Sequence, residues 1–144
     1  MKEISAGGVV YRKQNEALQI QLIQDRYGKI SFAKGKMEHG ETVEETALRE
    51  ILEETGIEGR IEAPIDVIRY QYEHPMHGLV DKEVHYYLVE AKSGQHQAQV
   101  EEIRGVSWFS PEEAWKQQKE AGYNNNDHIL QHALAKLNIS TDER

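Results

Sequence analysis

Alternating apolar and polar residues predict several strands along the chain. In residues 18–25, Leu18, Ile20 and Leu22 alternate with glutamines, which is the period of a half-buried strand. A Val- and Gly-rich stretch and three later segments have similar strand character. These further predicted strands cover residues 4–12, 61–72, 80–90 and 105–109. The two long segments flank a short loop over residues 73–79 and therefore predict a hairpin.

The strongest helix signal lies over residues 42–55. Thr42 is a candidate N-cap, and Glu45 three residues later completes a capping-box pattern. Gly56 follows as the expected C-terminal stop. Apolar residues recur at helical spacing between these two signals, so we expect one broad apolar face that packs against the strands.

Two more helices are predicted in the last third of the chain. Ser110 is a candidate cap with Pro111 at the first helical position, and residues 127–137 are amphipathic. Helices and strands alternate irregularly, and two long strands form a hairpin. We therefore expect an α/β fold in which helices pack on a mixed sheet, forming a single domain over residues 1–144.

Composition and charge narrow the range of possible functions. The 144 residues include no Cys, which excludes disulfides, thiolate metal sites and a cysteine nucleophile. The net charge of −8 makes nucleic acid an unlikely partner, because non-specific binding to it relies on surplus Lys and Arg. No apolar run or leader-like segment indicates a membrane, so the expected location is cytoplasmic. Small phosphorylated ligands stay possible when a divalent cation mediates.

Three glutamates gather on the flank of the apolar face of the predicted helix. Spacings of three and four residues place Glu50, Glu53 and Glu54 together, although their like charges repel. A hard cation such as Mg²⁺ would give a reason for this cluster. Arg49, four residues before Glu53, can orient that carboxylate. A solvated acidic surface is the competing interpretation, and the carboxylates alone favour it.

The residues around the cluster favour the metal-site interpretation over a solvated acidic surface. The chain has Gly35, five residues, Glu41, seven residues, and then Arg-Glu-Ile-Leu-Glu-Glu-Thr-Gly-Ile ending at Ile57. This pattern, residues 35–57, matches the Nudix box at every defined position. The chain thus resembles the Nudix hydrolases. The segments 6–10 and 107–114 resemble the first strand and the late strand–helix junction of that family.

The resemblance implies a Nudix-type α/β/α sandwich with a mixed β-sheet, and hydrolysis of a phosphoanhydride bond in a nucleoside diphosphate-linked substrate with Mg²⁺ or Mn²⁺. By position, Glu53 and Glu54 are the main metal ligands, and Glu50 holds a further cation or a metal-bound water. The backbone carbonyl of Lys34 is a further ligand, and Arg49 orients Glu53. The general base stays open between Glu50 and Glu54.

The resemblance also assigns roles outside the helix. Glu41 is expected to brace the loop that leads to the helix. Many family members take a base or ligand from a loop before the late strand, where this chain has Glu101 and Glu102. Glu102 fits that role slightly better, and two exposed loop carboxylates are the alternative.

Four residues are candidates for substrate binding. Lys34 and Lys36 could contact phosphates, Tyr72 could stack on a base, and Lys82 could bind a terminal phosphate. Simple solvent exposure of the lysines and packing of the tyrosines are the alternatives. The leading hypothesis is a pyrophosphohydrolase acting on a dinucleoside polyphosphate such as diadenosine tetraphosphate. A MutT-like nucleoside triphosphate pyrophosphohydrolase and a non-catalytic nucleotide-binding Nudix domain are the alternatives. In each case the partner is a small nucleotide, and the oligomeric state is not predicted.

Overall fold

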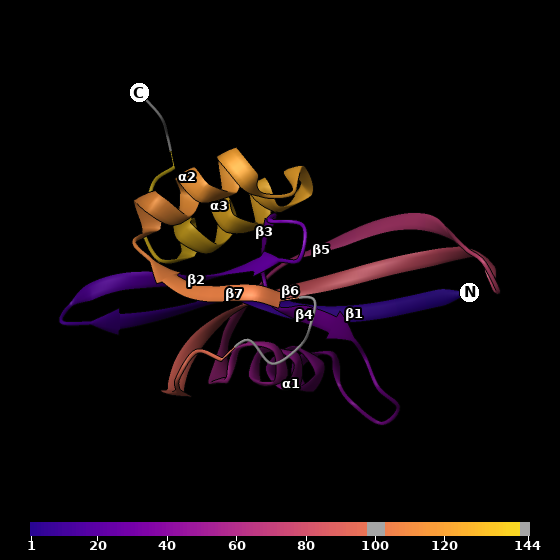
Figure 1. Ribbon diagram of the computed structural model, residues 1–144. Coiled ribbons are helices and arrows are strands. Elements are labelled where there is room, and N and C mark those ends of the chain that lie inside the picture. Colours follow the sequence, from indigo (N-terminus) through magenta and orange to yellow (C-terminus); the bar gives the residue numbers. More distant parts are fainter. Residues whose placement is uncertain (98–102, 142–144) are drawn as a thin grey trace.

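The fold is a seven-stranded mixed sheet between two helical layers (Figure 1). The computed structural model describes residues 1–97 and 103–141. The strands are β1 (Lys2–Gln14), β2 (Ala17–Asp25), β3 (Ile30–Ser31), β4 (Lys34–Lys36), β5 (Ile57–His74), β6 (Gly78–Gly94) and β7 (Ile103–Phe109). The helices are α1 (Val43–Thr55), α2 (Pro111–Ala121) and α3 (Asp127–Lys136), with a 3₁₀ turn, η1 (Asn124–Asn126), before α3.

The sheet has the order β3-β2-β1-β6-β5, with β4 also paired to β1 and β7 to β2. The long strands β1 and β6 run parallel, whereas the other pairs are antiparallel. The β5–β6 hairpin confirms the predicted strand pair, but both strands extend beyond the predicted ends and leave a shorter loop. Pro64 is tolerated inside β5 because this strand lies at the edge of the sheet.

Each face of the sheet packs against its own helices. One core forms between the sheet and α2–α3, from residues such as Val9, Leu22 and Leu130. The other forms between the sheet and α1, from residues such as Val10, Ile23 and Ile51. Neighbouring residues Val9 and Val10 thus serve opposite faces, as the period of two requires. Figure 1 shows α1 on one side of the sheet and α2 with α3 on the other, which confirms the predicted sandwich.

The helix caps follow the sequence signals closely. The Thr42 hydroxyl accepts from the backbone of Glu45, the Glu45 carboxylate accepts from the backbone of Thr42, and Gly56 ends α1 in the left-handed region at φ 79°. The Ser110 hydroxyl accepts from the backbone of Glu113 and so caps α2. The short strands β3 and β4 were not predicted, because segments of two and three residues carry no readable period.

Two further sequence predictions concern the loop glutamates and the membrane. Glu101 and Glu102 lie outside the described residues. Within residues 1–97 and 103–141, no helix is long and apolar enough to cross a membrane.

Candidate active site

The candidate site lies where α1 packs against β4. We call Glu50, Glu53 and Glu54 the box glutamates. The backbone amide of Lys34 donates to Oε1 of Glu54 at 3.2 Å. Gly35 is required beside it, because a Cβ at this position would overlap the Glu50 carboxylate. Strand β4 and helix α1 therefore bring the main chain of residues 34–35 against two of the three box glutamates.

Arg49 is the centre of the ion pairs in the site. Its Nε and Nη2 both donate to Glu41, and its Nη2 also donates to the carbonyl of Lys36 at 2.9 Å. Its Nη1 donates to Glu50 at 2.8 Å and to Glu53 at 3.2 Å. The hydrogen bonds from Arg49 are the main reason that the pKa of Glu41 falls to about 2. Arg49 thus ties the loop before α1 to two of the box glutamates.

The box glutamates differ in exposure. The Glu54 residue is 9% exposed, and the Glu50 and Glu53 side chains are 16% and 55% exposed. They therefore form a graded acidic wall that runs from the protein interior to solvent. Carboxylate oxygens and a nearby main-chain carbonyl are the hard donors that Mg²⁺ prefers.

The donor chemistry of this wall fits a magnesium or manganese ion. In the part of the chain that the structure describes, no three carboxylate or imidazole side chains already enclose a metal position. Mg²⁺ does not need such a cage, because it keeps several waters and usually takes one or two carboxylates together with substrate phosphates. Glu53, the most exposed box glutamate, accepts a hydrogen bond from Arg49 at 3.2 Å and keeps a solvent-facing carboxylate that can bind the metal.

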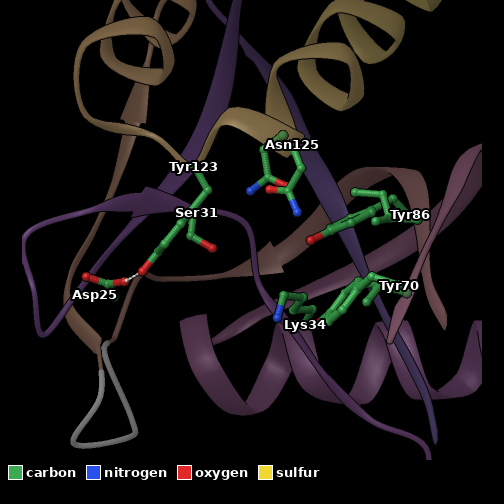
Figure 2. A pocket seen from close by; sticks show the side chains of 10 residues that line it. Asp25, Ser31, Lys34, Tyr70, Tyr86, Tyr123 and Asn125 are labelled. Atoms are coloured by element: carbon green, nitrogen blue, oxygen red, sulfur yellow. Dashed lines mark hydrogen bonds between the residues drawn. The ribbon is translucent and has the colours of Figure 1, made fainter. Parts of the chain in front are cut away.

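A cavity of about 320 Å³ opens on the side of the sheet that carries α2 and α3, and the box glutamates on α1 are not among its lining residues. Figure 2 shows Lys34, Tyr70 and Tyr86 along one side, with Asn125 and Tyr123 facing them from the chain between α2 and α3. We call it the site cavity. Lys34 connects it to the box glutamates, because its side chain lines the cavity and its backbone contacts Glu54. The surrounding protein, and then the Lys82 charge, lower the pKa of Lys34.

The loop before α3 contributes more to the site cavity than the sequence indicated. Asn124–Asn126 has the composition of a simple turn, but it forms the 3₁₀ turn η1, and Asn125 and Asn126 line the cavity. The Tyr123 hydroxyl donates to Asp25 at the rim (Figure 2). Tyr70, which is 45% exposed, also lines the cavity beside the buried Tyr86, whereas Tyr72 does not.

Three of the predicted substrate-binding residues converge instead on Glu3. Lys82 donates to Glu3 and, at 2.6 Å, to Ser5. The Tyr72 hydroxyl donates to Glu3 at 2.8 Å, and the Lys36 ammonium lies 3.3 Å from it. We call these five residues the Glu3 cluster. Lys82 is 7% exposed, whereas the Lys36 side chain is 68% exposed. Lys36 is therefore the cation of this cluster with open access to solvent.

The Glu3 carboxylate is ionised by its neighbours. Burial alone would raise its pKa, but hydrogen bonds from Lys82, Tyr72 and Lys36 outweigh this effect and hold the pKa at about 2. Sequence reasoning missed Glu3, which lies just before the strand predicted over residues 4–12. Its pairing with Lys82 depends on the parallel register of β1 and β6, in which Glu3 lies directly opposite Lys82.

Fold and site together define a class of protein. The NUDIX domain family model matches residues 1–133, which include the box and all of the core except the residues from Leu134 onward. The chain therefore belongs to the Nudix family.

Two curated relatives give the range of similarity. The chain is 38% identical over 114 residues to a protein of Mycobacterium tuberculosis named "Putative mutator protein MutT4", covering 74% of this chain and 45% of that protein. It is 35% identical over 98 residues to a Bacillus subtilis protein named "Putative 8-oxo-dGTP diphosphatase", covering 67% of this chain and 61% of that protein. The chain thus spans about half the length of these relatives.

A solved structure confirms the architecture. An Ap4A hydrolase of C. elegans in a binary complex superposes with a TM-score of 0.75, covering 94% of this chain and 98% of that chain. The two sequences are 24% identical, so this likeness establishes the fold alone.

Proposed function

We propose that this protein is a divalent-metal-dependent pyrophosphohydrolase that cleaves a phosphoanhydride bond in a nucleoside diphosphate-linked substrate. The observation that carries the proposal is the acidic wall of box glutamates, arranged by Arg49 and joined through Lys34 to a cavity of about 320 Å³. A cavity of this size is at the lower end of the range for small-ligand sites, and it suits a single nucleoside.

The residues divide the chemical work between them. Glu53 and Glu54, the Lys34 carbonyl and, for a further cation or its water, Glu50 would hold the metal. When bound, Mg²⁺ or Mn²⁺ neutralises phosphate charge and makes an attacking water more acidic. Glu50 or Glu54 would accept a proton from the attacking water. Arg49 orients Glu50 and Glu53, and Lys34 and Lys36 bring positive charge to the phosphates.

The site cavity supports a nucleoside beside the phosphates. Tyr70 supplies an aromatic face, and the Asn125 amide can both donate to and accept from a base edge. Stacking on an aromatic ring is worth roughly 1–3 kcal/mol per base, so Tyr70→Ala should raise KM by about tenfold with little change in kcat. Leu79→Ala on the same hairpin removes an exposed side chain outside the cavity and is the control.

The leading substrate is a dinucleoside polyphosphate such as diadenosine tetraphosphate. A long phosphate chain needs positive charge beyond the metal, and exposed Lys36 stands next to the acidic wall. A nucleoside triphosphate is the second candidate. Lys82, the lysine predicted to bind a terminal phosphate, donates to Glu3 and Ser5 instead. This favours the substrate with the shorter phosphate chain. The name of the Bacillus subtilis relative points the same way.

One panel of nucleotides separates these candidates. Diadenosine tetraphosphate, ATP, dGTP and 8-oxo-dGTP are incubated with Mg²⁺, and the products are separated by chromatography. Asymmetric cleavage of diadenosine tetraphosphate to ATP and AMP supports the first candidate. Release of monophosphate and pyrophosphate from a triphosphate supports the second. Binding without any turnover would instead identify a nucleotide-binding domain and contradict the proposed activity.

The loop glutamates are tested by substitution. If that loop supplies a base or ligand, one of Glu101→Gln and Glu102→Gln should lower kcat strongly, with Glu102 slightly favoured, and the other should be nearly silent. Two silent variants would leave the base among Glu50 and Glu54.

A further inference from the structure

A second cavity, of about 250 Å³, lies at the other end of β1. Arg12 and Lys13 of β1, Lys92 of β6 and Trp108 of β7 are among its lining residues. We call it the distal cavity. About 20 Å of extended strand separates Lys13 from Gly7, the residue that pairs with Lys34 at the candidate active site. Figure 1 shows the β1–β2 turn at the end of the sheet away from the start of β1.

The distal cavity gathers positive charge that no carboxylate of the described residues neutralises. Arg12, Lys13 and Lys92 have no carboxylate within ion-pair distance among residues 1–97 and 103–141, whereas Arg49, Arg60 and Lys82 each have at least one. Glu58, on the neighbouring strand, accepts a hydrogen bond from Ser93 of the rim at 3.4 Å. The distal cavity is thus a locally positive region on a chain of net charge −8.

The Arg12 guanidinium is held in place by uncharged groups. Its Nε donates to the side chain of Gln19 at 2.7 Å, and its central carbon lies 4.4 Å from the centroid of the Trp108 ring. In the described part of the chain, its two terminal nitrogens have no hydrogen-bond partner. Arg12 thus presents an oriented pair of donors, which is the arrangement that binds a phosphate group through two hydrogen bonds.

Trp108 is itself fixed from the neighbouring loop. The His96 ring stacks on it at 4.5 Å and 19°, and the buried Gln21 amide lies 3.1 Å from Nε2 of His96. Burial, and then the Arg12 charge, lower the pKa of His96 to about 4, so the ring is neutral at pH 7. The wall behind Arg12 is therefore held by ring stacking and a hydrogen bond, and its His96 ring carries no charge at pH 7.

We propose that the distal cavity is a second, non-catalytic site that binds the phosphate group of a small anion. Two lysines and an arginine match the double negative charge of a phosphate better than the single charge of a carboxylate. The cavity is smaller than the ~300–1,000 Å³ of typical small-molecule pockets, so it holds a phosphoryl or pyrophosphoryl group and not a whole dinucleotide. The anion comes either from inorganic pyrophosphate or from the phosphate end of a mononucleotide.

Trp108 gives a local signal for binding. The chain has two tryptophans, so Trp115→Phe leaves Trp108 as the only indole fluorophore. The full chain carrying this change is titrated with inorganic pyrophosphate, and separately with AMP, in EDTA and about 0.15 M NaCl to limit non-specific ion pairing. We expect a saturable change in Trp108 emission. A tighter response to AMP assigns a mononucleotide, and an equal or tighter response to pyrophosphate assigns the inorganic anion.

Matched variants show whether the anion binds specifically at the distal cavity or is attracted to the surface in general. Arg12→Gln and Lys92→Gln should each weaken binding by about tenfold, the loss expected for one charge-assisted contact. Lys116→Gln removes an exposed charge from α2, far from the cavity, and should leave binding unchanged. Circular dichroism checks that each variant folds. If Arg12→Gln does not fold, Lys92→Gln, a change at an exposed position, serves as the test.

Three results would overturn the proposal. The first is the absence of a saturable response. The second is an equal loss in all three charge variants, which would mean general attraction of anions to the surface. The third is much tighter binding of an RNA oligonucleotide that also depends on Lys116, which would identify an extended nucleic-acid surface. None of these outcomes bears on the hydrolase activity, which is measured separately with Mg²⁺.

Discussion

At the scale of single residues, Glu53 combines high exposure with a central place in the proposed chemistry. Its side chain is 55% exposed and accepts from Arg49 at 3.2 Å. Glu53→Gln removes a negative ligand with almost no change of shape, so we expect kcat to fall by about a hundredfold or more. Folding should survive, because one carboxylate in a repelling group is neutralised. Turnover at saturating Mg²⁺ and a thermal melt measure both effects.

A matched change elsewhere controls for the loss of charge. Glu120→Gln removes an exposed carboxylate from α2 and should leave both kcat and melting unchanged. Near wild-type turnover in Glu53→Gln would show that Glu53 is not a metal ligand.

Glu3 should make stability depend on acid pH. Its pKa is about 2 in the folded protein and about 4.5 without its partners, so the folded state binds fewer protons between these values. The stabilisation is therefore complete above about pH 4.5 and is lost as the pH falls towards 2. Near pH 7, Glu3→Gln should cost about 3 kcal/mol, because it leaves the buried Lys82 charge without its partner.

Urea unfolding at several pH values measures this dependence. The difference between wild type and Glu3→Gln should shrink from pH 5 to pH 2. Glu73→Gln, an exposed change on the β5–β6 hairpin that carries Tyr72 and Lys82, should show no such trend. A constant difference across this range would mean that Glu3 contributes through shape and not through charge.

At the scale of elements, the contact of β4 with α1 depends on Gly35. A Cβ there would overlap the Glu50 carboxylate, which is the mobile end of a long side chain. We expect Gly35→Ala to displace Glu50, lowering kcat by about tenfold or more. The cost in stability should stay below about 1 kcal/mol, because Gly→Ala also restricts the unfolded chain. Gly105→Ala, where a Cβ meets open space, should change neither. A large loss of stability without loss of activity would contradict this account.

Elements with strong local signals were predictable from sequence, and those set by tertiary register were not. Thr42 and Gly56 marked both ends of α1, because caps are local chemistry. The box placed Arg49 beside Glu50 and Glu53, because their spacing on one helix fixes their proximity. The Glu3 cluster joins two strands that are far apart in sequence, and Asn125 enters the site cavity only because α2 and α3 pack on the sheet.

At the scale of the whole molecule, metal binding and folding should be linked. A ligand that binds only the folded state stabilises it by about 2.7 kcal/mol at a hundred times its Kd. For a chain of this length, this corresponds to a rise in Tm of roughly 8 °C. We expect Mg²⁺ to produce such a rise in wild type and in Glu120→Gln, and a much smaller one in Glu54→Gln. Calorimetry at constant ionic strength measures it, and an equal rise in all three proteins would place the cation elsewhere.

The parallel pairing of β1 with β6 also dictates an order of assembly. The β5–β6 hairpin closes through neighbouring residues, whereas Glu3 meets Lys82 only when a loop of some 79 residues has closed. The contacts of Glu3 with Lys82, Tyr72 and Lys36 therefore form late, after the β5–β6 hairpin. During refolding from urea, the far-ultraviolet signal of strands and helices should return first, and hydrolytic activity should follow as a slower phase that Glu3→Gln slows further.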